Sequence, residues 1–277
     1  MVNYHNHTAL CGHATGTLDE YLGWHGQLHG ERMLQFFALD PNNPTSIFSC
    51  LRAARTNAHA VRGRITADMW ENMNSTWLEM RGIAAEGLTR YGISRFCEWV
   101  KQRSQLFRGA TTGTLMRHDA YRFLRLGTHI ERADNTLRLL GSRYEMLGDK
   151  EASLTEGSAY AYYQWTALLR ALSASEAYTE LYRDAPGVRQ VSELLILRDD
   201  LPRSLHSCLD EINQILVSLP GNTGRSAQRL GAELGARLRF TSVDDILSEG
   251  LHVWLSDFIV EIGNLADAIQ RSYLEVA

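Results

Sequence analysis

Apolar residues recur at steps of three and four along most of this chain, with short polar stretches between them. The clearest case spans residues 119–147. This spacing places the apolar side chains on one side of a helix. Because each residue adds about 1.5 Å, we predict a helix about 40 Å long. Its apolar positions are Phe123, Leu126, Ile130, Ala133, Leu137, Leu140 and Tyr144.

Polar residues that begin and end helices frame similar stretches upstream. Thr45 or Ser46 can cap a helix that ends by Gly63, and Thr66 begins the next one. A third helix is expected over about 93–108. The segment from Gly109 to His118 contains two glycines and several threonines, so we expect a connection there.

The second half of the chain continues the same pattern. No stretch alternates apolar and polar residues as a strand would. Helices joined by short polar connections favour antiparallel neighbours. The predicted fold class is therefore all-α, an antiparallel multi-helix bundle. We expect its further helices at about 157–173, 175–183, 187–198, 202–218 and 223–238, with a second long helix at 242–274.

The first 34 residues differ from the rest, because they are rich in histidine and glycine. We predict a poorly regular N-terminal segment over 1–34 and a helical domain over 35–277. Four widely spaced cysteines form no CxxC motif, so reduced thiols are expected and neither a zinc motif nor a redox motif is indicated. We expect no cofactor.

The net charge and the hydropathy of the chain bear on two classes of partner, nucleic acids and membranes. The net charge is −4 and the basic residues are dispersed, so we expect no nucleic-acid partner. No apolar run reaches the roughly 18 residues that cross a bilayer, and the start lacks a signal-peptide core. We therefore expect no membrane contact and a cytoplasmic location.

Two predicted helices share the spacing R-x2-R-x3-H-x2-R. Steps of three, four and three put all four basic side chains on one face. Such faces could line an arginine-rich groove between packed helices and hold carboxylates or phosphates. The alternative is two polar surfaces whose arginines are solvated or locally paired. The residues are Arg52, Arg55, His59 and Arg62, then Arg122, Arg125, His129 and Arg132.

A further face of the 119–147 helix carries Gly127, Glu131, Asp134 and Arg138. A glycine within a long helix often marks close packing or room for a ligand. If Glu131 is buried, it needs a cationic partner. Two roles stay open for Glu131: a buried Glu-Arg bridge that fixes the register of the helices, or a catalytic carboxylate.

The sequence GTHIERADNT at 127–136 resembles the motif of the bacterial alpha-E domain, an all-helical family named for its Glu-Arg pair. Three further segments are similar to that family in the same order. The resemblance extends from about residue 35 to the C-terminus. The segments are DPNNPTSI at 40–47, LRAARTNA with VRG over 51–63, and MWE at 69–71 with Asn74.

This resemblance implies a candidate site but no established reaction. Genes of the family typically sit beside ATP-grasp ligases and transglutaminase-like proteases, which implies a part in making or modifying peptides. It also implies that Glu131 is an orienting group or general base. The ligand-binding candidates, for a carboxylate or phosphate, are Arg52, Arg55, Asn57, Arg132 and Asn135.

The N-terminus departs from the family. A first helix with a Glu-Arg-Ala-Glu-like segment is not found, and residues 1–22 look like the opening of a PHP-type histidinol phosphatase. That resemblance makes His5 and His7 metal ligands, with His13 nearby. The rest of the chain supplies no strands or late ligands for such an enzyme, so we expect no metal site.

The leading hypothesis is a helical accessory or binding protein of a peptide synthesis or modification system. Its partners would be an ATP-grasp ligase and a transglutaminase-like protein, with an anionic or peptide ligand. The alternative is an enzyme, acting through Glu131 and its arginines or as a PHP-type phosphoesterase at His5 and His7. A nonfunctional hybrid that folds incompletely is the third hypothesis.

Overall fold

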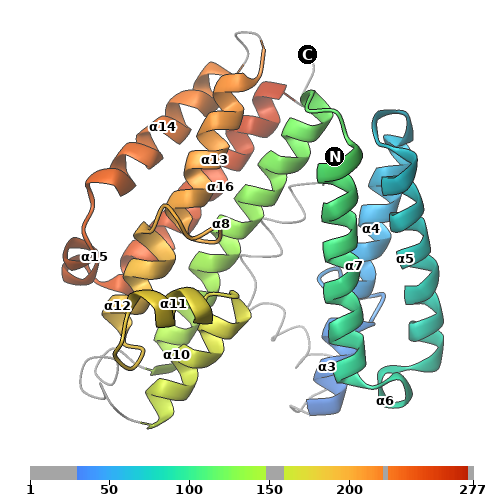
Figure 1. Ribbon diagram of the computed structural model, residues 1–277, viewed down its shortest axis with the longest axis horizontal. Coiled ribbons are helices and arrows are strands. Elements are labelled where there is room, and N and C mark those ends of the chain that lie inside the picture. The colour runs from blue at the N-terminus through green and yellow to red at the C-terminus, as the bar shows by residue number, and fades with distance from the viewer. Residues whose placement is uncertain (1–29, 148–158, 221–223, 274–277) are drawn as a thin grey trace. The chain divides into compact units, whose positions relative to one another are not determined.

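The structure is a computed structural model that describes residues 30–147, 159–220 and 224–273. Every regular element in these ranges is a helix and none is a strand (Figure 1). The all-α prediction is therefore confirmed. The chain divides into two compact units, unit 1 over residues 1–121 and unit 2 over residues 122–277.

Unit 1 is built around the packing of α5 against its neighbours. Helix α4 lies along one side of α5, and α7 packs on α5 as well. Ser46 and Thr66 cap α4 and α5, as predicted, by accepting hydrogen bonds from backbone N–H groups three residues on. Its described elements are α3 (Gly30–Ala38), α4 (Ile47–Ala60), the 3-10 helix η1 (Arg62–Arg64), α5 (Ala67–Glu86), α6 (Leu88–Tyr91) and α7 (Ile93–Thr114).

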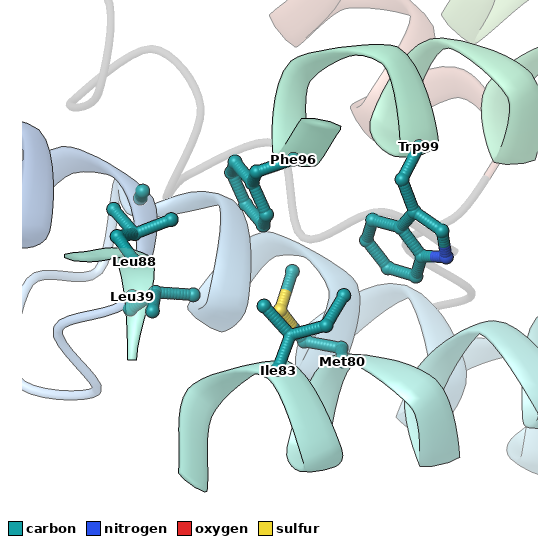
Figure 2. Close-up of a cluster of buried hydrophobic side chains, with 7 residues drawn as sticks. Leu39, Met80, Ile83, Leu88, Phe96 and Trp99 are labelled. Atoms are coloured by element: carbon teal, nitrogen blue, oxygen red, sulfur yellow. The ribbon is translucent and has the colours of Figure 1, made fainter. Parts of the chain in front are cut away.

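The core of unit 1 fills the space where these helices meet. Figure 2 shows Met80 and Ile83 of α5 facing Phe96 and Trp99 of α7. Leu88 and Leu39 extend the cluster toward α6 and the end of α3. Each such side chain contributes roughly 2 kcal/mol by leaving water, so this cluster is a main source of stability.

A polar contact fixes the register of α5 against α7. The indole N–H of Trp99 donates to a Glu79 carboxylate oxygen at 2.7 Å. Arg103, one turn further along α7, donates to both oxygens of the same carboxylate, at 2.7 Å each. Sliding α7 by one turn would break all three bonds, so Glu79 sets how the two helices align.

Unit 2 contains the long helix predicted over 119–147 and the helices that follow it. Helix α13 packs on α14, and α14 packs on α16. Apolar side chains are buried at steps of three and four along α13, along α16 and from Leu126 to Leu140 of α8, which is the predicted periodicity. Its elements are α8 (Asp119–Leu147), α10 (Ala159–Ala171), α11 (Ser175–Leu181), α12 (Val188–Ser192), the π-helix η2 (Glu193–Leu197), α13 (Leu205–Ser218), α14 (Arg225–Phe240), α15 (Val243–Glu249) and α16 (Leu251–Tyr273).

Two glycines allow α13 and α14 to approach closely. The Asn213 side chain of α13 lies against the backbone of α14 and donates to the Gly231 carbonyl at 3.0 Å. A Cβ at Gly231 would collide with the Asn213 amide oxygen, and a Cβ at Gly235 would lie 2.8 Å from its amide nitrogen. A side-chain atom at either position would therefore displace the Asn213 amide from its place against α14.

Replacing Gly231 by alanine is expected to destabilise the protein by about 1–2 kcal/mol. Overpacking costs about 1–3 kcal/mol, and the helix preference of alanine over glycine offsets about 0.5–1 kcal/mol of that. Gly263 of α16 is the matched control, since a Cβ there meets no atom within 4 Å. Gly263→Ala should raise the urea midpoint while Gly231→Ala lowers it. Equal shifts would contradict the close approach.

Helix α7 runs further than the sequence predicts. The segment from Gly109 to Thr114 was expected to be a connection, and this prediction is wrong because α7 continues to Thr114. Each threonine hydroxyl there donates to the carbonyl four residues earlier, as Thr111 does to Phe107 at 2.9 Å. The hydroxyls therefore bond within the helix and do not compete for its backbone hydrogen bonds. The low helix propensity of threonine is consequently a weak guide to the structure of this segment.

The helix expected over 242–274 is divided at Gly250. Ser242 and Asp245 form a capping box at the start of α15, which ends at Glu249. Gly250 has a φ of 100°, which glycine adopts without strain, and α16 begins after it. The predicted start is correct, but the prediction of one continuous helix is wrong because Gly250 separates α15 from α16.

Helix α3 occupies the end of the stretch that was expected to be poorly regular. It begins at Gly30, and its residues Phe36 and Ala38 are buried. Packing of these side chains in unit 1 outweighs the glycine-rich composition around them. The rest of the predicted segment 1–34, including His5, His7 and His13, lies outside the described residues.

None of the helices in the described part of the chain combines the length and apolar character that crossing a bilayer requires. Among the described cysteines, Cys50, Cys97 and Cys208 are free thiols, as predicted from their spacing.

Candidate functional site

The loop Asp40–Ser46 positions the start of α4. The side chain of Asn43 is fully buried and donates to the Phe36 carbonyl at 3.0 Å. Its amide oxygen accepts from the backbone N–H of Thr45 at 2.9 Å and from the Thr45 hydroxyl at 2.7 Å. The buried Ser46 hydroxyl donates to the Asp40 carbonyl at 2.6 Å. This segment, quoted above for its resemblance, therefore has a structural role.

Arg52 is held against this loop. One of its terminal nitrogens donates to the Pro41 carbonyl at 3.2 Å. Its guanidinium carbon also lies 5.9 Å from the centre of the Phe48 ring. These contacts occupy only some of the five N–H donors of the guanidinium. The Arg52 side chain remains exposed. Arg52 is thus an oriented surface cation.

Two further basic residues of α4, together with one of η1, gather around one indole of α5. Arg62 was expected on the same helix as Arg52, Arg55 and His59, but α4 ends at Ala60 and Arg62 begins η1. We call this group the Trp70 cluster: Arg55, His59, Arg62 and Trp70. The guanidinium carbons of Arg55 and Arg62 lie 5.6 and 5.1 Å from the centre of the Trp70 ring. The His59 ring lies 5.5 Å away, centre to centre. A cation over an indole face is attracted by the ring quadrupole, so Trp70 holds two arginines in place.

Asn74 orients Arg55 within this cluster. Its amide oxygen accepts from the Arg55 Nε at 3.0 Å, one turn of α5 beyond Trp70. This bond uses one donor and leaves the two terminal nitrogens, which are those that grip a carboxylate in pairs. Asn57, the remaining predicted residue of α4, is partly buried and lies between Arg55 and His59 in the sequence.

The arginines of α4 have no carboxylate partner in the described residues. Within residues 30–147, 159–220 and 224–273, no Asp or Glu oxygen lies within 4 Å of a guanidinium nitrogen of Arg52, Arg55 or Arg62. Asp68 and Glu71 flank Trp70 in the sequence but form no such pair. These arginines therefore have no carboxylate at ion-pair distance in the described part of the chain.

The second copy of the R-x2-R-x3-H-x2-R spacing, on α8, has a different environment. Arg125 donates to a Glu211 carboxylate oxygen of α13 at 2.8 Å. The Nε2 of His129 lies 3.7 Å from the same oxygen, beyond hydrogen-bond distance. The matching spacing thus gives an arginine paired with a carboxylate on α8, and on α4 arginines without a carboxylate partner among the described residues.

His129 of this helix is a buried titratable group with a strongly shifted pKa. Its side chain is 4% exposed and neither ring nitrogen has a hydrogen-bond partner in the described residues. Burial, and then the neighbouring Arg125, lower the pKa of His129 from 6.5 to about 4, although Glu211 opposes this shift. His129 is therefore neutral at pH 7.

Cys208 lies one turn before Glu211 on α13 and is fully buried. Burial raises the pKa of its thiol to about 11, although Arg132 and Arg203 lower it. The thiol is therefore protonated at pH 7. Since the thiolate is the reactive form, Cys208 is not a nucleophile in this state.

The predicted α8 residues are only partly buried. Glu131 and Arg132 are half-buried and neither lacks a partner, while Asn135 is exposed. On the neighbouring face, Arg138 donates to the Asp134 carboxylate at 2.9 Å. These residues belong to unit 2, whereas the α4 residues belong to unit 1. Their roles, including that of Glu131 as a structural or catalytic carboxylate, stay predictions.

No group of three or more His, Cys, Asp or Glu side chains suited to a metal ion occurs in the described ranges. This search does not include His5, His7 and His13, which lie in the first 29 residues.

Comparison with known families gives a match over almost the whole length. The model of the Alpha-E family, a predicted alpha-helical domain with a conserved ER motif, matches residues 5–274. The chain belongs to the Alpha-E family. No curated protein and no solved structure matches the chain.

This Alpha-E match confirms the resemblance drawn from the sequence, and it also takes in the histidines near the start. The chain contains two Glu-Arg pairs, Glu31–Arg32 in α3 and Glu131–Arg132 in α8. The resemblance given above rests on the second pair. Glu31 and Arg32 are exposed at the start of α3.

Three residues that contact the arginines of these faces were absent from the predicted site: Trp70, Asn74 and Glu211. Trp70 and Asn74 occur in the segments that resemble the family, so a signal for them was present. Glu211 lies 86 residues from its partner Arg125, and no spacing in the sequence links the two. Such a pair is found only once α8 and α13 are placed together.

Proposed function

We propose that this Alpha-E protein is a binding protein of a peptide synthesis or modification system, and that α4 holds the carboxylate or phosphate groups of its ligand. The observation that carries the proposal is the set of oriented arginines without a carboxylate partner among the described residues. Guanidinium groups bind carboxylates and phosphates through paired, charge-assisted hydrogen bonds.

The Trp70 cluster suits such a ligand because its cations are already oriented. Stacking on Trp70 and the bond to Asn74 restrict Arg55 before any ligand arrives. Less side-chain freedom is then lost on binding, which favours affinity. Arg62 contacts the same ring, so one indole restricts both cations.

Replacing both Arg55 and Arg62 by glutamine is expected to weaken binding of inorganic phosphate at least about tenfold, since each charge-assisted bond contributes about 1.5–3 kcal/mol before solvent screening reduces it. Titration calorimetry at low ionic strength measures the change. The matched control is Arg81→Gln with Arg108→Gln, which removes the same charge from exposed positions of unit 1. Equal weakening in both double variants would contradict a specific site.

The proposed partners are an ATP-grasp ligase and a transglutaminase-like protein, as the family resemblance implies. Affinity capture with the full chain from its native host, followed by mass spectrometry, tests this. Recovery of either partner by the full chain but not by the Arg55→Gln, Arg62→Gln variant would also place the contact at α4. Recovery of neither would refute this part of the proposal.

A further inference from the structure

The basic residues of α4 continue beyond the Trp70 cluster in both directions. Arg52 precedes the cluster, and Arg64 follows Arg62 in η1. Arg52, Arg62 and Arg64 are all exposed. From Arg52 to the end of α4 at Ala60 the helix rises about 12 Å, and η1 extends the row. The surface is thus a row of cations and not a single point.

The spacing of these cations limits the ligand that can neutralise them. A single carboxylate or phosphate reaches one or two guanidinium groups. The guanidinium carbons of Arg55 and Arg62 contact one ring at 5.6 and 5.1 Å. Arg52 lies about 4.5 Å nearer to the start of α4 than Arg55, at 1.5 Å per residue. Neutralising the whole row therefore requires several anionic groups on one ligand.

An extended polypeptide meets this requirement. It advances about 3.3 Å per residue, so four or five residues span the roughly 12–16 Å from Arg52 to η1. Glutamate and aspartate side chains along such a segment present planar carboxylates, which match the fork of an arginine. The aromatic partners of the arginines, Phe48 and Trp70, are only partly buried and can add apolar contact to such a segment.

We propose that the partner of α4 is an extended acidic polypeptide segment, with carboxylates placed along the row from Arg52 to Arg64. This rests on the proposed anion-binding function and specifies its ligand. The row holds no carboxylate partner in the described residues for Arg52, Arg55 or Arg62, so an acidic segment would supply the missing charge. Neutral segments would lack that gain.

Three probes test the proposal on the full chain at low ionic strength: a labelled pentaglutamate peptide, the matching pentaglutamine peptide and blocked single glutamate. Fluorescence anisotropy measures the labelled peptides, and calorimetry measures the single residue. An exposed carboxylate–arginine pair contributes about 0.2–1 kcal/mol, or roughly 1.4- to fivefold in affinity. We therefore expect pentaglutamate to bind at least about tenfold more tightly than single glutamate and pentaglutamine.

Variants locate the binding. Arg52→Gln together with Arg64→Gln should weaken pentaglutamate at least about threefold, and by a larger factor than it weakens inorganic phosphate, whereas Arg81→Gln with Arg108→Gln should change neither. Circular dichroism confirms that each variant is folded.

The outcomes separate this proposal from the function on which it rests. If phosphate binds through Arg55 and Arg62 but pentaglutamate binds no tighter than single glutamate, the acidic-segment proposal is overturned and anion binding stands. Equal binding of pentaglutamine also overturns it. If neither phosphate nor pentaglutamate binds, both proposals fail.

Discussion

Replacing Asn43 by alanine is expected to destabilise the protein by about 2–4 kcal/mol. The Asn43 side chain makes three hydrogen bonds in a fully buried position, one to the Phe36 carbonyl and two with Thr45. Its removal leaves the Phe36 carbonyl and the Thr45 N–H without these partners. A buried polar group that loses its partner costs about 1–3 kcal/mol, and two groups are affected here.

Urea unfolding followed by circular dichroism measures this loss. Asn42→Ala is the matched control, because the bond of Asn42 to Asp40 is made by its backbone N–H and its side chain is exposed. The control should stay within about 0.5 kcal/mol of the parent chain. If both variants lose the same free energy of unfolding, the loop does not depend on the Asn43 side chain as described.

Acidification from pH 7 to pH 4 is expected to remove about 3 kcal/mol of stability through His129 alone. The pKa of His129 is about 4 in the folded chain and 6.5 in the unfolded chain. Between these values the unfolded chain binds a proton that the folded chain does not. Stability from this group is thus complete above pH 6.5 and is lost as the pH falls toward 4, at about 1.4 kcal/mol per pKa unit.

His129→Leu isolates this contribution, since leucine removes the titrating group and both unpaired nitrogens. The free energy of unfolding of this variant should fall by about 3 kcal/mol less than that of the parent between pH 7 and pH 4. His252→Gln is the control, because His252 is exposed beside Glu145. A His129→Leu variant with the parent's pH dependence would contradict a neutral buried imidazole.

The sequence predicted those parts of the fold in which local pattern and packing agree. The long helix over 119–147 and the caps at Ser46 and Thr66 were found at the predicted positions. The predictions from the sequence failed where the conformation of a residue depends on its surroundings. The threonines near Thr111 belong to α7 because their hydroxyls donate to carbonyls of that helix. Gly250, which has a positive φ, separates α15 from α16.

The candidate site shows the same limit more clearly. The identical R-x2-R-x3-H-x2-R spacing occurs on α4 and α8, yet Arg125 meets Glu211 whereas Arg55 meets Trp70 and Asn74. Spacing fixes which side chains share a helix face. It does not fix what the neighbouring helix presents to that face. Locally paired charge is found on α8, whereas a ligand-binding face on α4 stays a proposal.

The described thiols of this chain differ in their accessibility to alkylating reagents. Cys50 and Cys97 are exposed in unit 1, whereas Cys208 is buried in unit 2 with a pKa of about 11. Alkylating reagents need an accessible thiolate. While α13 stays packed, Cys208 is protected both by its burial and by the raised pKa of its thiol. Reaction at Cys208 consequently marks the moments when the helices of unit 2 separate, and its rate follows that opening.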